Sequence, residues 1–372
     1  MRVLFLTPER FATVPLPSYP DIRLAIATTR RVAGEIGALA PDYIHIATEG
    51  PLGMAARRAC LQQGLAFTTA YHTRFPEFIG ARFPVPERLS YWWLRRFHNA
   101  GNGMMVATAS LGAEMATRGF RRIKRWSRGV DTRLFDPGRR QDLGLPRPVF
   151  LNVGRVAVEK NLPAFLSLDL PGSKVVVGDG PDLPMLRKRY PDVHFLGRRT
   201  GEDLAAVYAS ADAFVFPSRT DTFGNVILEA LASGLPVAAF PVTAPRDILS
   251  PGGGALAEDL RTAALAALDI PRDLARKRAL TYSWSACAHE FLGNLTPATA
   301  ARPSRRAPSG ALSGGPEQGR DEAGGGGSWP SALCLPSTTG SRPVASSLPS
   351  STPHWSKELM LNSAPSTKTR CS

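Results

Sequence analysis

Two acidic residues eight positions apart, Asp221 and Glu229, are the side chains of this 372-residue chain that best fit a chemical role. An apolar run at residues 213–217 precedes them, which predicts a strand, a polar loop and a helix beginning near Phe223. Eight residues span about 12 Å of helix, so one acid would lie at the helix mouth and the other deeper on the same broad face. Unpaired N–H groups at the helix start attract anions. This element can therefore hold a sugar hydroxyl, a phosphate and a ribose hydroxyl in a row.

The stretch 221–229 resembles the acid–seven residues–acid signature of retaining glycosyltransferases of family 4, which have the GT-B fold. Its Thr-Asp-Thr-Phe-Gly context resembles the branch that transfers mannose or related hexoses, often to lipid acceptors. Four further segments resemble family motifs and follow the family's order: Tyr-His-Thr-Arg-Phe at 71–75, Arg-Gly-Val-Asp at 128–131, the diphosphate loop at 154–161 and Val-Gly-Asp-Gly-Pro at 177–181. The resemblance covers roughly residues 1–295.

Two cations, Arg155 and Lys160, lie five residues apart after a predicted strand at 149–153. Cations there can neutralise a departing nucleotide diphosphate, which is the main electrostatic demand of breaking a sugar–phosphate bond. The alternative is a pair of solvated surface cations. By resemblance, Asp221 contacts the donor sugar and Glu229 contacts the ribose hydroxyls, although an acid that complements a helix dipole plus a solvated glutamate would show the same pattern.

The resemblance implies a larger set of donor-binding residues, which comprises Gly154, Arg155, Lys160, Asp179, Arg198, Asp221, Thr222, Phe223, Gly224, Asn225 and Glu229. Within it, Phe223, Gly224 and Asn225 would present backbone N–H groups. Asp179 equally fits a turn former in Gly-Asp-Gly-Pro. Arg198 and its neighbour Arg199 would lie beside the nucleotide base.

Three residues are expected on the acceptor side or at the reacting face. By resemblance, His72 lies near the reacting face of the sugar and joins Arg155, Lys160 and Asp221 as a catalytic residue; a simple hydrogen-bonded histidine is the alternative. Arg74 would assist with phosphate or acceptor. Glu49 follows a predicted strand and would touch the acceptor, but it could equally cap the next helix.

Short Val-, Ile- and Phe-rich runs alternate with amphipathic segments in two series, which indicates an α/β protein with two Rossmann-like domains of parallel sheet. In the first series strands are expected at residues 3–7, 43–47, 67–71 and 104–108; in the second they are expected at 148–153, 174–177, 193–196, 213–216 and 236–240. The predicted boundaries are an acceptor-side domain at 1–135, a nucleotide-sugar domain at 136–281, a closing helix at 282–296 and a disordered low-complexity tail at 297–372.

Both ends depart from the family pattern. The start resembles the family's second strand region, so the usual first βα unit with its Gly-rich loop is expected to be missing from the first domain. The Pro-, Ser- and Gly-rich tail has no apolar periodicity, which predicts disorder and suggests out-of-frame translation. Truncation at Leu295 is then expected to leave thermal stability unchanged. An alternative to an active enzyme is therefore a catalytically impaired sugar-nucleotide-binding remnant.

Composition limits the partners. The four cysteines show no paired spacing, which fits a reducing compartment, and no apolar run suits a signal peptide or a bilayer span. The net charge of +14 fits nucleic acid, phosphorylated substrates or an anionic membrane. No nucleic-acid motif is present. Arginines interleaved with Trp92, Trp93, Phe97, Phe120 and Trp126 fit a membrane surface and a solvated basic face equally well.

The sequence therefore predicts a cytoplasmic hexosyltransferase, peripheral on the inner membrane face, that moves mannose from GDP-mannose to a lipid or glycolipid. A UDP-sugar-dependent sulfoquinovosyl or glucosyl transferase is the alternative from the same fold. No Asp-x-Asp pair follows a strand, so no cofactor and no obligatory metal are expected. The resemblance implies retention at the anomeric carbon, with the departing phosphate accepting the acceptor's proton.

Overall fold

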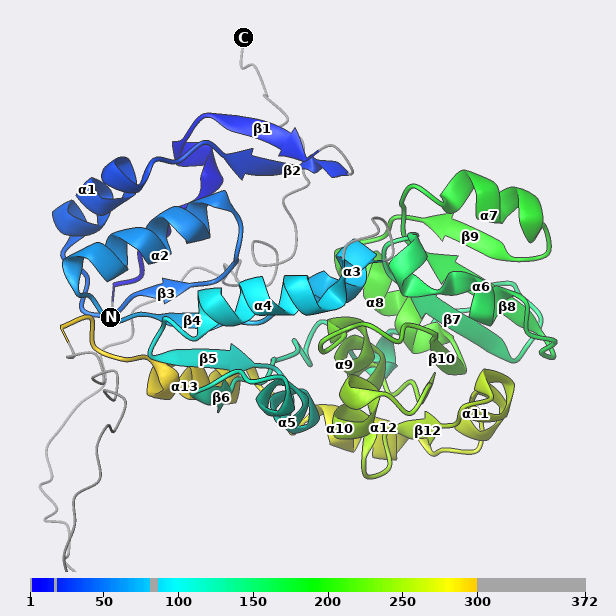
Figure 1. The fold of residues 1–372 in the computed structure, drawn as a ribbon. Helices are drawn as coiled ribbons and strands as arrows, with labels where there is room; N and C mark the ends of the chain where they lie inside the picture. The colour runs from blue at the N-terminus through cyan, green and yellow to red at the C-terminus, as the bar shows by residue number, and fades with distance from the viewer. Residues whose placement is uncertain (1, 17–18, 81–85, 300–372) are drawn as a thin grey trace, which may run out of the picture. The chain divides into compact units, whose positions relative to one another are not determined.

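The computed structural model describes residues 2–16, 19–80 and 86–299. Its main unit contains two parallel sheets, a four-stranded one in the order β3-β4-β5-β6 and a six-stranded one in the order β12-β11-β10-β7-β8-β9 (Figure 1). A separate two-stranded sheet consists of β1 (Thr13–Leu16) and β2 (Tyr19–Ala25), most of which belongs to a second unit. The predicted α/β class with two parallel sheets is confirmed.

The four-stranded sheet is built from βα units. Its strands are β3 (His45–Ile46), β4 (Thr68–Ala70), β5 (Gly103–Val106) and β6 (Ile123–Arg125). The helices of this part are α1 (Thr29–Leu39), α2 (Pro51–Gln63), α3 (Phe75–Gly80), α4 (Glu87–His98) and α5 (Ala109–Thr117). All residues of β4 and β5 are buried, because helices cover both faces of a parallel sheet.

The six-stranded sheet follows the same rule. Its strands are β7 (Val149–Val153), β8 (Ser173–Val177), β9 (His194–Gly197), β10 (Ala213–Phe216), β11 (Val237–Ala239) and β12 (Gly254–Leu256). Its helices are α6 (Leu162–Leu166), α7 (Leu183–Arg189), α8 (Gly201–Ser210), α9 (Asn225–Ala232), α10 (Thr243–Leu249), α11 (Leu260–Ala267) and α12 (Arg272–Ala279). Short 3₁₀ turns lie at Pro8–Arg10, Pro137–Arg139 and Val158–Lys160.

The strand order of the six-stranded sheet reverses at β7. From β7 the chain adds β8 and then β9 on one side, and it returns to add β10 on the other side. The carboxyl ends of β7 and β10 therefore lie next to each other while their connections leave in opposite directions. In open α/β sheets, ligands bind at such a switch point.

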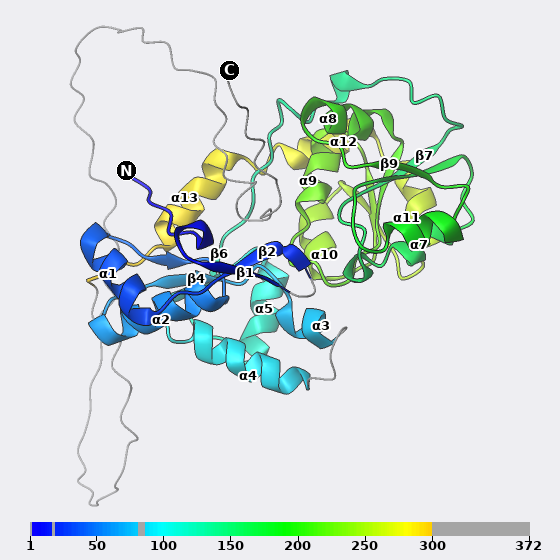
Figure 2. The same ribbon diagram turned by 90° about the horizontal axis from the view of Figure 1, so that it is seen from above.

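Helix α13 (Trp284–Asn294) follows the six-stranded sheet in sequence but lies beside β6 of the four-stranded sheet (Figures 1 and 2). Lys124 Nζ donates to the Asn294 carbonyl oxygen at 2.6 Å, and the Ser127 N–H donates to Glu290 at 2.7 Å. Ser283 begins the helix by accepting a hydrogen bond from the Ala286 N–H. The last described segment thus stabilises the first sheet.

Three local predictions need correction. Residues 3–7 form no strand; the side chains of Val3, Leu4 and Phe5 are exposed, and an apolar run becomes a strand only where a neighbouring strand accepts its hydrogen bonds. The helix expected near Phe223 begins at Asn225, after Gly224 with φ of 81°.

The third correction concerns residues 297 and 298, which the sequence analysis places in the tail. Pro297 forms an antiparallel bridge with Tyr43, and Ala298 exchanges backbone hydrogen bonds with Asp42 and Ala66 while its own side chain is buried. Ordered structure thus extends at least to Ala298. The predicted disorder from residue 300 onward lies outside the described residues.

Candidate functional site

The loops after β7 and β8 approach so closely that only glycine fits between them. A Cβ added to Gly178 would lie 1.8 Å from the carbonyl oxygen of Gly154, and one added to Gly180 would lie 2.3 Å from that of Val156. The φ of Gly178 is 145°, which side-chain-bearing residues rarely adopt. Val156 N–H donates to the Asp179 carbonyl oxygen at 2.9 Å. The two loops therefore form one continuous backbone surface at the switch point.

The loop after β10 joins this surface from the other side. Asn161 donates to the Pro217 carbonyl oxygen at 3.1 Å, which ties the end of the β7 loop to the end of β10. Lys160 Nζ then reaches both carboxylate oxygens of Asp221, at 2.7 and 3.0 Å. Both side chains are partly exposed. Two predicted site residues that are 61 positions apart are thereby brought into direct contact.

The other predicted donor cations are exposed and follow strands of the same sheet. Arg155 is exposed in the β7 loop, one residue beyond Gly154. Arg198 is exposed directly after β9, two strands away from β7. Asp179 accepts a hydrogen bond from the Gly180 N–H at 2.7 Å, as a turn-forming aspartate does.

Helix α9 begins without a side-chain cap. Gly224 is its N-cap residue and has no side chain that could accept from the first N–H groups of the helix, and the Ile227 N–H donates to the Gly224 carbonyl oxygen at 2.9 Å. The Asn225 Oδ1 atom is buried and has no hydrogen-bond partner in the described part of the chain. Phe223 is buried and its ring meets that of Tyr282 edge-on at 6.2 Å. The start of α9 therefore combines an N-terminus without a side-chain cap, which favours an anion, with a buried Asn225 oxygen that can accept from a hydroxyl, while Phe223 itself packs in the interior.

Glu229 lies in the second turn of α9 and accepts a hydrogen bond from Tyr208 Oη at 2.9 Å. Burial raises the pKa of the Glu229 carboxyl to about 7, against the opposing effect of the tyrosine hydrogen bond. Tyr208 comes from α8 and is fully buried. Sequence reasoning missed Tyr208; the only signal was an aromatic hydroxyl in the otherwise apolar run at residues 204–209, since such a group usually finds a partner when buried.

His72 follows β4 and is held at two points. Its carbonyl oxygen accepts a hydrogen bond from the Thr222 hydroxyl at 2.6 Å, and its Nδ1 lies 2.8 Å from Arg128 Nη2. The His72 Nε2 atom is buried and has no partner among the described residues. Burial and the nearby Arg128 lower the pKa of His72 well below its usual value. The ring is therefore neutral, and the His72 backbone lies next to the Asp221–Thr222 segment.

Arg74 is surrounded by acids. Its guanidinium donates to Glu114 at 2.8 and 2.6 Å and to Glu77 at 3.2 Å, and it also donates to the Thr243 hydroxyl at 3.0 Å. These carboxylates hold its pKa above the usual value despite burial. Two acids already compensate its charge, so the structure favours a positioning role.

Glu49 is buried and accepts from His98 Nε2 at 2.9 Å, while His98 Nδ1 meets Thr69 Oγ1 at 2.9 Å. The N-cap of α2 is Gly50, and the helix has no side-chain cap, so the capping alternative does not hold. Glu49 therefore lies in an interior hydrogen-bond chain.

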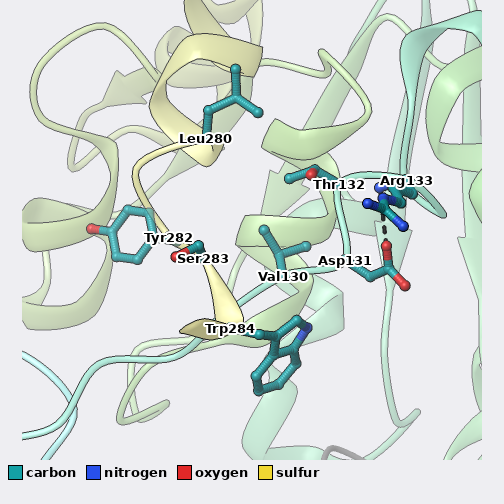
Figure 3. A pocket seen from close by; sticks show the side chains of 8 residues that line it. All are labelled: Val130, Asp131, Thr132, Arg133, Leu280, Tyr282, Ser283 and Trp284. Atoms are coloured by element: carbon teal, nitrogen blue, oxygen red, sulfur yellow. Dashed lines mark hydrogen bonds between the residues drawn. The ribbon is translucent and has the colours of Figure 1, made fainter. Parts of the chain in front are cut away.

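A cavity of about 350 Å³ lies elsewhere, where residues 130–133 pass residues 280–284 (Figure 3). Figure 3 shows the two segments lining it from opposite sides, and Val130 N–H donates to the Tyr282 carbonyl oxygen at 3.1 Å. No predicted site residue lines this cavity. Within the described ranges, no three His, Cys, Asp or Glu side chains gather as metal ligands would, and no helix is both long and apolar enough to cross a bilayer.

Family models match both halves of the chain. Residues 4–134 match the model described as "Glycosyltransferase Family 4", and residues 147–277 match "Glycosyl transferases group 1". A "GDP-mannose-dependent alpha-mannosyltransferase" of Mycobacterium tuberculosis (strain CDC 1551 / Oshkosh) is 32% identical over 307 residues, which cover 77% of this chain and 81% of the relative. "Sulfoquinovosyl transferase SQD2" of Arabidopsis thaliana is 34% identical over 244 residues, covering 60% of this chain and 48% of that protein.

Solved structures share the fold. Sucrose-phosphate synthase from Thermosynechococcus elongatus superposes with a TM-score of 0.59 at 20% identity, covering 71% of this chain and 75% of that one. HepE from Anabaena, in complex with UDP and glucose, gives 0.55 at 15% identity, covering 70% of this chain and 80% of its own. At these identities the likeness concerns the arrangement of sheets and helices alone.

Proposed function

Because this chain belongs to family 4 of the glycosyltransferases, we propose that it transfers mannose from GDP-mannose to a lipid or glycolipid acceptor. The protein is a glycosyltransferase with the GT-B fold. The observation that carries the finer proposal is the joining of three loops at the switch point, with Lys160 and Asp221 in contact beside the start of α9. Two GDP-mannose-dependent alpha-mannosyltransferases, 32% and 31% identical to this chain, support mannose as the donor sugar.

The proposed donor site divides the nucleotide sugar among these loops. The diphosphate lies at the glycine-lined backbone of Gly154 with Arg155 and Lys160 around it, since cations and backbone N–H groups stabilise phosphate charge. Asp221 and the N–H groups at the start of α9 contact the hexose. Glu229 accepts hydrogen bonds from the ribose hydroxyls, and Arg198 borders the base.

The proposed reaction keeps the anomeric configuration. The acceptor hydroxyl attacks on the face that the nucleotide leaves, the bond between the anomeric carbon and the phosphate oxygen breaks, and the departing phosphate takes the acceptor's proton. Arg155, Lys160 and the helix start stabilise the charge that develops on the diphosphate. The proposal includes no metal: two cations and a helix end supply the positive charge that a metal would otherwise bring.

A second donor is favoured by one comparison. The similarity to a sulfoquinovosyl transferase covers 60% of the chain, so a UDP-sugar is the competing donor. The two proposals share the chemistry and differ at the base, which Arg198 and its neighbours would border.

The test is transfer with purified full-length protein and a short-chain diacylglycerol or phosphatidylinositol acceptor. Mass spectrometry of the lipid product from GDP-mannose, UDP-glucose and UDP-sulfoquinovose names the donor, and NMR of the product gives its anomeric configuration. Mannosyl transfer with retention is expected. Donor binding without any transfer would support the sugar-nucleotide-binding remnant instead, and an inverted product would exclude the proposed mechanism.

We further propose that the enzyme works on an anionic membrane surface through helix α4. One face of this helix exposes Leu89, Trp92 and Trp93, with Arg88 and Arg96 among them. Apolar and basic side chains on one helix face suit the boundary between headgroups and acyl chains. Of the aromatic residues that were expected at this surface, only Trp92 and Trp93 are exposed. Phe97, Phe120 and Trp126 are buried in the core.

Vesicle sedimentation tests this surface. Arg88 has no ion-pair partner among the described residues, so Arg88→Glu should weaken binding to phosphatidylglycerol vesicles by at least about fivefold. The matched control is Arg30→Glu, an equal change of charge at an exposed position of α1. Equal losses in both variants would mean that net charge alone, and no defined surface, attracts the protein.

A further inference from the structure

Arg128 lies just after β6, and its guanidinium is fixed from three sides. Nη2 donates to His72 Nδ1 at 2.8 Å, and Nη1 donates to the carbonyl oxygens of Trp126 and Ser127, both at 3.0 Å. The guanidinium also lies over the Trp126 ring, 4.3 Å from its centroid. Two backbone contacts and one stacked ring leave Arg128 little freedom to turn away from His72.

The direction of this hydrogen bond determines the tautomer of His72. Arginine carries donors and no acceptor, so His72 Nδ1 must accept and must be unprotonated. In a neutral imidazole the proton then resides on Nε2. The charged and titratable groups around the ring are Arg128, His45 and His98, and none of them favours an imidazolium. The carboxylate of Glu49 is engaged by His98 instead.

We propose that Arg128 is a positioning residue that holds His72 as a neutral Nε2–H donor, ready for a hydroxyl of the sugar substrate. The inference rests on the proposed function, because it takes the substrate to be a sugar. Nε2 is buried without a partner among the described residues, and an unpaired buried donor is costly unless a ligand or water meets it. The Thr222 hydroxyl ties the His72 backbone to the segment that carries Asp221.

A neutral side chain at position 128 would not fix the His72 tautomer. A neutral residue there releases Nδ1, so both tautomers become accessible and the nearby positive charge that disfavours the imidazolium is lost. Burial alone would still disfavour the charged ring. The Arg128 side chain therefore determines which ring nitrogen of His72 carries the proton. Burial of the ring in the protein interior keeps it neutral.

Nitrogen-15 NMR of histidine-labelled full-length protein tests the tautomer directly. The His72 signal is assigned by its loss in His72→Gln, and the expected spectrum shows protonated Nε2 and unprotonated Nδ1 between pH 6 and 8. In Arg128→Met a mixture of tautomers and a higher His72 pKa are expected. Protonated Nδ1 in the wild type, or an unchanged spectrum in Arg128→Met, would overturn the proposal whether or not the chain transfers hexose.

A double-mutant cycle tests the consequence for transfer. Arg128→Met and His72→Ala should each lower kcat/KM by about 100-fold, and the double variant should lose little more than either single one. Arg128→Lys keeps a cationic donor and should recover at least tenfold. Additive losses would show that Arg128 acts apart from His72. If Arg128→Met does not fold, Arg128→Lys and the wild-type NMR spectrum still decide the question.

Discussion

At the scale of single residues, Lys160 and Asp221 neutralise each other across two loops that follow neighbouring strands. In the proposed mechanism the lysine stabilises the departing diphosphate and the aspartate contacts the hexose. Each side chain thus has a partner in the protein and a second one in the donor. Removing either leaves the other charge uncompensated in a partly buried site, which costs more than an exposed pair does.

Lys160→Met should therefore lower kcat/KM for hexosyl transfer by about 100-fold, on the scale of losing one preorganised electrostatic group. The matched control is Lys277→Met, which removes an exposed lysine from α12. Steady-state kinetics on both variants provide the comparison. Equal activity of the Lys160 and Lys277 variants would remove Lys160 from the mechanism.

The raised pKa of Glu229 should make the free energy of unfolding depend on pH. Its folded pKa of about 7 lies above its unfolded value near 4.5, so the folded state binds the extra proton between these values. The stabilisation is fully present below about pH 4.5, is lost as pH rises to 7 and stays lost above; it amounts to about 3 kcal/mol at most. Urea denaturation at pH 5 and pH 8 should show a smaller difference for Glu229→Gln than for the wild type. An identical difference would mean that another group titrates.

At this scale the sequence predicted which elements carry the proposed site residues, because the motifs place Lys160 after β7 and both Asp221 and Glu229 after β10. What the sequence could not show are the partners. Tyr208 meets Glu229 from another helix, and Arg128 meets His72 across 56 residues, so only the tertiary fold brings them together. Glu49 was expected at the end of a strand, and only the fold shows that its carboxylate meets His98.

At the scale of elements, the glycine loops after β7 and β8 form the site because their backbones touch. Gly178→Ala places a methyl group 1.8 Å from a carbonyl oxygen and should cost several kcal/mol of unfolding free energy, since the backbone must shift. Gly37→Ala is the control: it lies in α1 with nothing within 4 Å of the added Cβ and should gain up to about 1 kcal/mol. Urea denaturation measures both; a Gly178 variant as stable as the wild type would contradict the close approach.

Most predicted strands were confirmed: the expected runs from residue 43 to 108 overlap β3, β4 and β5, and those from 148 to 240 overlap β7 to β11, whereas β6 and β12 were not predicted. The exception at residues 3–7 shows the limit of the pattern. An apolar run indicates that its residues prefer burial. A strand also needs a neighbouring strand that pairs with its backbone hydrogen-bonding groups, and the local sequence does not show whether such a neighbour exists.

At the scale of the whole molecule, the chain returns to its first sheet after completing the second. Helix α13 lies beside β6, and Ala298 then fills a place in the core that includes Phe11 and Ile44. The expectation that truncation at Leu295 leaves thermal stability unchanged is therefore revised. Truncation at Leu295 should lower the melting temperature by several degrees, whereas a chain that ends at Thr299 keeps every described contact. Calorimetric scans of the two shortened chains compare them, and equal melting temperatures would show that Ala298 contributes nothing.

The central claim is that the loops at the switch point of the six-stranded sheet bind the diphosphate of a nucleotide sugar. Isothermal titration calorimetry of the full-length protein with GDP-mannose, repeated with Lys160→Met and Lys277→Met, tests it most directly. The account predicts saturable binding to the wild type and to the Lys277 variant and at least tenfold weaker binding to the Lys160 variant. Absence of binding to GDP-mannose and to the UDP-sugars, or equal affinity in all three proteins, would contradict it.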